Sequence, residues 1–250
     1  MCGGRVGSPT ISSREVWNLG RETLAWKRLP DLTHSRSAHA CCVVRGGTLV
    51  ALGGWDIIEG APISNASVEV LERAAEEWRE LPLLSCGRRQ DLFAVAVEES
   101  GSVEGQVCIL GGVRGAWGEV LDEGCIVDLA TGVCTPQPGL SIPRTDMASV
   151  RLPDGCIIVA GGWSDDGAII QDSAEVWEPS RGAWRELEEM GTRRCSSSCC
   201  MLSDSRFAVF GGSGGQGDID ECRAGECMQS AATPKILDGA VQAEPRLSPS

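Results

Sequence analysis

The sequence predicts an all-β protein built from repeated four-stranded antiparallel sheets. One pattern recurs about every 50 residues, each repeat holds about four short apolar stretches, and the i, i+3, i+4 spacing of amphipathic helices is absent from the repeats. Four strands per repeat of this length are typical of the blade of a β-propeller. About four such blades fit into the 250 residues.

An apolar stretch that ends in a glycine pair marks each repeat. The four stretches are TLVALGGW, VCILGGV, CIIVAGGW and FAVFGGS, with the pairs Gly53 and Gly54, Gly111 and Gly112, Gly161 and Gly162, and Gly211 and Gly212. The opening MCGG places another pair, Gly3 and Gly4, 50 residues before the first of these. Residues 1–13 therefore read as the remnant of a preceding repeat.

Two further landmarks follow each glycine pair. The first is a short acidic and apolar motif, seen as EVWN from Glu15, EVLE from Glu69, CIVD from Cys125 and EVWE from Glu175. The second is a single residue, namely Trp26, Trp78, Cys134 or Trp184. Because a large indole fills space between stacked sheets, we expect Trp26, Trp78 and Trp184 to be structural. The blade with Cys134 should pack less well.

Before each glycine pair, a small turn separates two apolar strands. Arg-Gly-Gly and Pro-Asp-Gly are two of these turn sequences, and such turns favour β-hairpins. Inner strand pairs are predicted over 38–54, 92–112, 146–162 and 196–212, and outer pairs over 15–29, 68–82, 125–136 and 174–187. The pair at 15–29 could complete the sheet of 196–212 and close four blades. Alternatively the propeller is partial, and its open edges favour self-association. Residues 14–212 then form the propeller and 213–250 a flexible tail.

In its landmarks the chain resembles the kelch-repeat family. The repeats extend through residues 1–212. Each follows the order apolar strand, Gly-Gly, loop, Glu-Val-aromatic-acidic, about eight residues, Trp and a later Arg. The resemblance implies a kelch-type β-propeller of the galactose-oxidase-like fold group. Two departures are that the usual Tyr of the acidic motif is Trp17, Leu71, Val127 or Trp177, and that Cys134 replaces the late Trp.

Composition narrows the class of protein. The formal net charge of −13 disfavours a broad nucleic-acid or anionic-membrane surface, which would need Lys and Arg. The N-terminus shows no signal-peptide pattern, and no apolar run approaches the length of a membrane span. Several of the 13 cysteines lie in apolar runs and are read as reduced thiols. We therefore expect a soluble cytoplasmic protein.

No catalytic, cofactor or metal site is predicted. Copper-radical oxidases of this fold group need a Tyr, and the chain has none. The two histidines, His34 and His39, lie near one strand and read as a loop and a strand residue. Asp165 and Asp166 read as a solvated loop. Cys222 and Cys227 could form half of a metal site or a small disulfide loop, but no second ligand pair that would complete a metal site lies nearby.

Arginine and tryptophan recur on one predicted rim of the blades. Arg36, Arg144 and Arg194 each lie 17 residues before the first glycine of a pair. The loops at this end also hold Arg88, Arg89, Trp55, Trp117 and Trp163. Guanidinium groups bind carboxylates and indoles add apolar contact, so this rim is a candidate site for a protein or acidic peptide. The alternative is that the arginines brace neighbouring acidic loops.

The function expected from this pattern is a non-catalytic protein-interaction module. The resemblance adds that kelch propellers serve as substrate-recognition parts of ubiquitin-ligase adaptors when joined to BTB or F-box domains. Two alternatives stay open. The chain could be an enzyme or small-ligand binder that uses a central channel, as galactose oxidases and sugar-acid isomerases do, or an incomplete fragment of a longer kelch protein.

Overall fold

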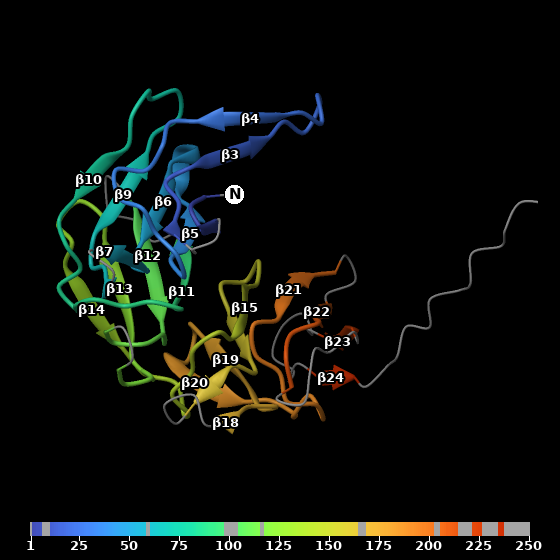
Figure 1. The fold of residues 1–250 in the computed structure, drawn as a ribbon. Helices are drawn as coiled ribbons and strands as arrows, with labels where there is room; N and C mark the ends of the chain where they lie inside the picture. Colours follow the sequence, from blue (N-terminus) through green and yellow to red (C-terminus); the bar gives the residue numbers. More distant parts are fainter. Residues whose placement is uncertain are drawn as a thin grey trace, which may run out of the picture. The chain divides into compact units, whose positions relative to one another are not determined.

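The computed structural model describes residues 2–6, 11–58, 61–97, 105–115, 118–164, 169–202, 206–214, 222–226 and 235–237. These residues form β-strands and one short 3-10 helix, Arg45–Gly47. The chain divides into two compact units, residues 1–146 with 164–169, and residues 147–163 with 170–250. In Figure 1 the strands of the first unit run from blue to green and those of the second from yellow to red.

Two four-stranded antiparallel sheets form the body of the first unit. The first has the order β10-β9-β6-β5 and the second the order β11-β12-β13-β14. Their strands are β5 (Ala40–Val43), β6 (Leu49–Leu52), β9 (Val68–Leu71), β10 (Arg79–Leu81), β11 (Phe93–Val97), β12 (Gln106–Leu110), β13 (Gly124–Asp128) and β14 (Cys134–Gln137). Each sheet corresponds to one predicted blade.

The second unit holds two further sheets of the same design, ordered β15-β16-β19-β20 and β21-β22-β23-β24. Their strands are β15 (Ala148–Arg151), β16 (Ile157–Ala160), β19 (Ala174–Glu178), β20 (Ala183–Glu186), β21 (Ser198–Met201), β22 (Arg206–Phe210), β23 (Cys222–Glu226) and β24 (Lys235–Leu237). The all-β class and the four-stranded blades predicted from the sequence are confirmed.

Of the two arrangements that the sequence left open, the pairing of 15–29 with 196–212 is not the one observed. The outer pair β3 (Val16–Leu19) and β4 (Trp26–Leu29) forms a two-stranded sheet, while β22 pairs with β23, and β23 with β24. The prediction that 15–29 completes the sheet of 196–212 is therefore wrong. Residues 222–226 and 235–237, which lie in the part predicted to be a flexible tail, form β23 and β24. Pairing with β23 satisfies the backbone hydrogen-bonding groups at the edge of β22. It closes a shorter loop than pairing with 15–29 would, so it costs less loop entropy.

The opening residues repeat the register of the later blades. Cys2 forms an antiparallel bridge with Val16, just as Leu52 pairs with Val68 and Leu110 with Gly124. Gly3 and Gly4 have positive φ angles of 56° and 108°, like the other glycine pairs. The Cys-Gly-Gly segment thus occupies the place of an inner-strand end beside β3.

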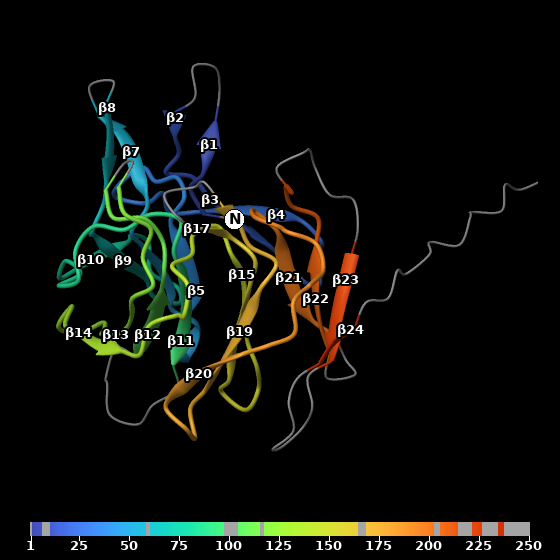
Figure 2. The same cartoon turned by 90° about the horizontal axis from the view of Figure 1, so that it is seen from below.

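Short hairpins extend from the loops that follow the first two glycine pairs. They are β1 (Arg5–Val6) with β2 (Ile11–Ser12), and β7 (Trp55–Ile58) with β8 (Ala61–Ser64). Figure 2 shows both hairpins leaving the first unit at the same end, side by side. Another two-stranded sheet is formed by β17 (Trp163–Ser164) and β18 (Ile169–Ile170).

The inner strands are buried on both faces because blades pack against each other. Val50 and Leu52 of β6 share one apolar cluster with Val107 and Ile109 of β12. In the second unit Ile158 and Ala160 pack in a cluster that also holds Val209 of β22. The continuous apolar runs in the sequence are therefore blade interiors.

The glycine pair after β6 shows why glycine ends each inner strand. Gly53 and Gly54 have φ angles of 66° and 85°, in the left-handed region that side chains rarely adopt. A Cβ on Gly54 would lie 2.6 Å from the carbonyl oxygen of Ser37, and one on Gly53 would lie 2.6 Å from that of Arg89. The pair thus lets two backbones approach each other closely.

Candidate functional site

Four of the arginines predicted for the binding rim are interior residues. The exposed fractions are 0% for Arg36, 1% for Arg89, 0% for Arg144 and 0% for Arg194. A guanidinium group without solvent exposure cannot contact a partner, so their assignment to a binding rim is wrong. The alternative, in which these arginines brace the fold, is the one that their burial supports.

Arg36 shows how such a residue holds a blade together. Its Nη1 donates to the carbonyl oxygens of Gly53 (2.8 Å) and Ser67 (3.2 Å). Its Nη2 donates to Ser67 Oγ at 2.6 Å, and its Nε to Glu69 Oε1 at 3.1 Å. The side chain therefore satisfies the carbonyl at the end of β6 and a carboxylate on β9 together, at 0% exposure of both charged groups.

The other buried arginines show parts of the same arrangement. Arg194 Nη1 donates to the carbonyl oxygen of Gly211 at 3.0 Å, again 17 residues away. Arg89 Nη2 donates to Glu123 Oε2 at 2.7 Å.

The backbones of the arginines link successive repeats as well. The carbonyl oxygen of each arginine accepts a hydrogen bond from the N–H of the second glycine of the preceding pair. These bonds are Gly4 to Arg36 (2.8 Å), Gly54 to Arg89 (2.7 Å), Gly112 to Arg144 (2.9 Å) and Gly162 to Arg194 (2.7 Å).

Glu69 is the partner that the sequence analysis missed. Burial alone would raise the pKa of its carboxyl, but the hydrogen bonds and charge of Arg36 and the backbone N–H groups of Thr33 and His34 outweigh it and lower that pKa. The signal was available in the glutamates that begin three of the acidic motifs, of which Glu69 and Glu175 are buried. A buried carboxylate needs such a cation and donors.

The tryptophans fall into different environments. Trp78 is buried, and its indole N–H donates to the carbonyl oxygen of Pro30 at 2.8 Å, so its structural role is supported. Trp184 is half-buried and lies 5.7 Å from Trp177 between ring centroids. Trp26 is 56% exposed and does not fill an interior gap. It lies in a two-stranded sheet, where fewer neighbouring strands are available to cover it.

The remaining residues of the predicted rim do not form one site. Trp55 and Trp163 are half-buried and Arg88 is exposed. Trp117 lies outside the described residues. With the four buried arginines removed, no cationic cluster remains around these tryptophans among the residues that the structure places.

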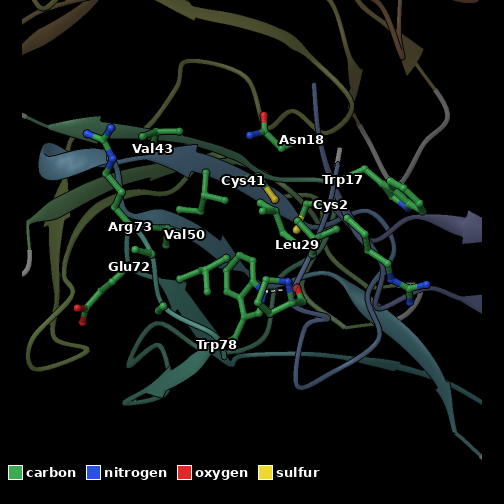
Figure 3. Close-up of a pocket in the computed structure, with 18 of the residues that line it drawn as sticks. Cys2, Trp17, Asn18, Leu29, Cys41, Val43, Val50, Glu72, Arg73 and Trp78 are labelled. Atoms are coloured by element: carbon green, nitrogen blue, oxygen red, sulfur yellow. Dashed lines mark hydrogen bonds between the residues drawn. The ribbon is translucent and has the colours of Figure 1, made fainter. Parts of the chain in front are cut away.

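A groove of about 980 Å³ lies in the first unit between the sheet β3-β4 and the sheet β10-β9-β6-β5. Its apolar lining includes Leu29, Val50, Leu71 and Trp78. Figure 3 shows Arg73 and Trp17 toward opposite ends of the groove, with Cys2 and Cys41 between them. Residues of β3 and β4 line the groove on one side, and residues of β5, β6 and β9 line it on the other.

The rim of the groove is charged. Lys27, Arg28 and Arg73 bring cations, and Glu72 and Glu76 bring carboxylates. Arg28 is partly neutralised, since it forms ion pairs with Glu15 at 3.2 Å and Asp31 at 2.9 Å. Lys27 on β4 and Arg73 after β9 then lie on the two sides of the groove. The rim thus offers cations on both sides beside carboxylates, on a chain whose net charge is −13.

Cys2, His39 and Cys41 meet inside the groove, with their sulfur and nitrogen atoms within 4.8 Å of one another. A hydrogen bond from Cys41 and the neighbouring His39 lower the pKa of Cys2 to about 5, although burial opposes this. The same bond raises the pKa of Cys41. The prediction that His39 is a plain strand residue missed this contact, because Cys2 and His39 are far apart in the sequence. The group offers a thiolate nucleophile or soft metal ligands.

Comparison with known proteins agrees with this architecture. Residues 144–191, which include the third blade, match the Kelch motif family. This part of the chain thus carries a Kelch motif, and the chain has the fold of a kelch-type β-propeller. The solved structure of YjhT superposes with a TM-score of 0.71 at 13% identity, covering 94% of this chain and 80% of that one.

One curated relative of this chain is adagio-like protein 2 from Oryza sativa subsp. japonica. It is 26% identical over 212 residues, which cover 80% of this chain and 32% of the relative. The chain thus spans about a third of the length of that protein. Among the residues that the structure describes, no helix is both long and apolar enough to cross a membrane.

Proposed function

We propose that this kelch chain is a non-catalytic protein-interaction module that binds an extended, acidic peptide segment in the groove between β3-β4 and β10-β9-β6-β5. The observation that carries the proposal is the groove itself. It combines an apolar floor with cations on both sides in a chain that is otherwise strongly acidic. Kelch repeats commonly mediate contacts between proteins, which supports the general class.

The dimensions and chemistry of the groove favour a peptide. Its volume of about 980 Å³ lies at the upper end of the range for small-molecule sites, about 300–1,000 Å³. It is bordered by a two-stranded sheet, and an extended segment can add to such a sheet through main-chain hydrogen bonds. Carboxylates of the peptide would approach Lys27 and Arg73, while apolar side chains would contact Leu29 and Trp78.

A displayed library of extended peptides tests the proposal. Peptides selected on the full chain should be enriched in Asp and Glu, and their affinity should fall with rising salt. The double variant Lys27→Glu/Arg73→Glu should weaken binding at least about tenfold, which corresponds to about 1.4 kcal/mol. Arg88→Glu is the matched control, because it also reverses an exposed arginine but lies outside the groove lining. Equal losses in both variants would reject the groove as the binding site.

A finer role follows from the resemblance to ubiquitin-ligase adaptors. We propose that the groove selects substrates for such a ligase when the propeller is joined to an adaptor domain. Fusing the chain to a ligase-recruiting domain should promote ubiquitylation of a carrier protein that displays a selected peptide. Loss of this effect with Lys27→Glu/Arg73→Glu, but not with Arg88→Glu, is the expected pattern.

A second candidate function uses the Cys2, His39 and Cys41 group in the same groove. A thiolate beside an imidazole can attack an electrophilic carbon, so the groove could hold a small substrate. Peptide binding that survives the Cys2→Ser substitution favours the interaction module. Turnover of an electrophilic substrate that the same substitution abolishes would favour the enzyme.

A further inference from the structure

Three cysteines converge in the second blade, away from the groove. Cys86 comes from the loop after β10, Cys125 from β13 and Cys134 from the start of β14. Their sulfur atoms lie within 4.8 Å of one another, and Cys86 Sγ is 3.2 Å from Cys134 Sγ. Cys125 is buried and the other two are half-buried, so the group is reachable from solvent.

The repeat shows that two of these cysteines replace structural landmarks. The position of Cys125 is held by Glu69 in the first blade and by Glu175 in the third, and the position of Cys134 by Trp78 and Trp184. Counted from the arginine of each repeat, Cys86 takes the place of Thr33, whose backbone N–H bonds Glu69. In the second blade, three cysteines thus stand where the first blade joins its loop to its outer strands.

The surroundings of the sulfurs suit a cation held by thiolates. The cysteines line a pocket of about 460 Å³ that also contains Arg89, Asp122 and Glu123. Arg89 is 1% exposed, and its Nε atom has no hydrogen-bond partner in the described part of the chain. Three thiolates around a divalent cation carry a net charge of −1, which the nearby guanidinium group stabilises.

We propose that Cys86, Cys125 and Cys134 form a binding site for a thiophilic divalent cation, with Zn²⁺ as the expected ion and water as the fourth ligand. Tetrahedral zinc with Zn–S bonds of about 2.3 Å spaces its sulfur ligands about 3.8 Å apart, so the three sulfurs need to shift by no more than about 1 Å. The ion would join the loop of Cys86 to the outer strands. It would replace the cross-link that a buried glutamate and an indole supply in the first blade.

Metal content and cobalt spectroscopy on the untagged full chain test the site. Protein refolded with Zn²⁺ under reducing conditions should retain one equivalent at this site after desalting. Co²⁺ should give thiolate-to-metal charge-transfer absorption and intense visible bands of tetrahedral geometry. A chelator should reverse both signals and lower Tm, since metal that binds only the folded state stabilises it. Cys134→Ser and, separately, Cys86→Ser should abolish the charge-transfer band.

Matched variants keep the test decisive. Cys200→Ser is the control, because Cys200 is an exposed cysteine outside both thiol groups. Cys2→Ser/Cys41→Ser removes the second group and should leave the cobalt bands intact. Circular dichroism establishes that each variant is folded. If Cys134→Ser does not fold, Cys86→Ala replaces it in the test. No charge-transfer band at saturating Co²⁺, or a band that persists without Cys86 and Cys134, overturns the proposal. So does a Cys86–Cys134 disulfide that mass spectrometry finds in protein purified under reductant.

Discussion

Arg36 and Glu69 form an ion pair in which neither side chain is exposed to solvent. The two residues are 33 positions apart, and Arg36 also donates to the backbone at the end of β6. A buried pair of this kind is costly to break, because removal of one partner leaves an uncompensated charge in the interior. It therefore provides a direct test of whether the repeated arginines brace the blades.

Replacing Arg36 with Met should strongly destabilise the fold. The substitution keeps an unbranched side chain but leaves Glu69 buried without its cation, so the free energy of unfolding should fall by about 3–5 kcal/mol. Denaturant unfolding followed by circular dichroism measures this. Arg88→Met is the control and should change stability by no more than about 0.5 kcal/mol, since Arg88 is exposed. Similar small effects of both substitutions would contradict the bracing role.

The same pair predicts a dependence of stability on pH. The pKa of Glu69 is lower in the folded state than its ordinary value of 4.5, so the pair stabilises the fold above that pH. This contribution should be lost as the pH falls below 4.5 toward the folded-state pKa. The difference in Tm between the wild type and Glu69→Gln should be constant at neutral pH and shrink in acid. A difference that grows in acid would reverse the sign and reject the assignment.

Two glycines with the same φ angle allow the stability cost of backbone strain to be measured apart from the cost of close packing. Gly54 and Gly47 both have φ of 85°, but only Gly54 faces a neighbour, the Ser37 carbonyl oxygen at 2.6 Å from an added Cβ. Gly47→Ala should cost about 1 kcal/mol from conformation alone, and Gly54→Ala should cost distinctly more. Thermal unfolding of both variants measures the difference. Equal costs would show that the strand ends need glycine only for its conformation.

The tryptophans should differ in their contribution to stability. Trp78→Ala removes a buried indole and its hydrogen bond to Pro30, at a cost of about 3–5 kcal/mol. Trp26→Ala removes a side chain that is 56% exposed, so its cost should be much smaller, about 1 kcal/mol or less. Denaturant unfolding of the two variants under one condition provides the comparison. A large cost at Trp26 would indicate that something covers this residue in solution.

Cys2 should react as a thiolate at neutral pH. Its pKa is lowered to about 5, so its alkylation by iodoacetamide should be nearly independent of pH between about 6 and 8. An ordinary cysteine with a pKa of about 8.5 becomes roughly tenfold more reactive per pH unit over most of this range. Mass spectrometry of the peptide that contains Cys2 measures the rate. Cys41→Ala should shift the profile to higher pH, and a wild-type rate that still climbs through neutrality would contradict the contact.

Much of the fold could be predicted because the same strand pattern recurs several times along the sequence. The inner strands that precede Gly54, Gly112 and Gly162 lie where the apolar runs placed them, and each glycine pair has positive φ. The candidate site was predicted less well. Arg36 and Arg194 were correctly grouped by their 17-residue spacing, yet their side chains point inward, and the groove was not anticipated.

By itself, the sequence determined the all-β class, the period of the blades and the positions that need glycine, since these depend on local periodicity and backbone conformation. Only the tertiary structure decided that the arginines are interior braces and that β23 and β24 complete the sheet of β22. It also decided that sulfur atoms gather at two places within the described residues. The reason is that burial, edge pairing and clustering depend on which remote segments meet across a sheet, and spacing along one chain does not specify that partner.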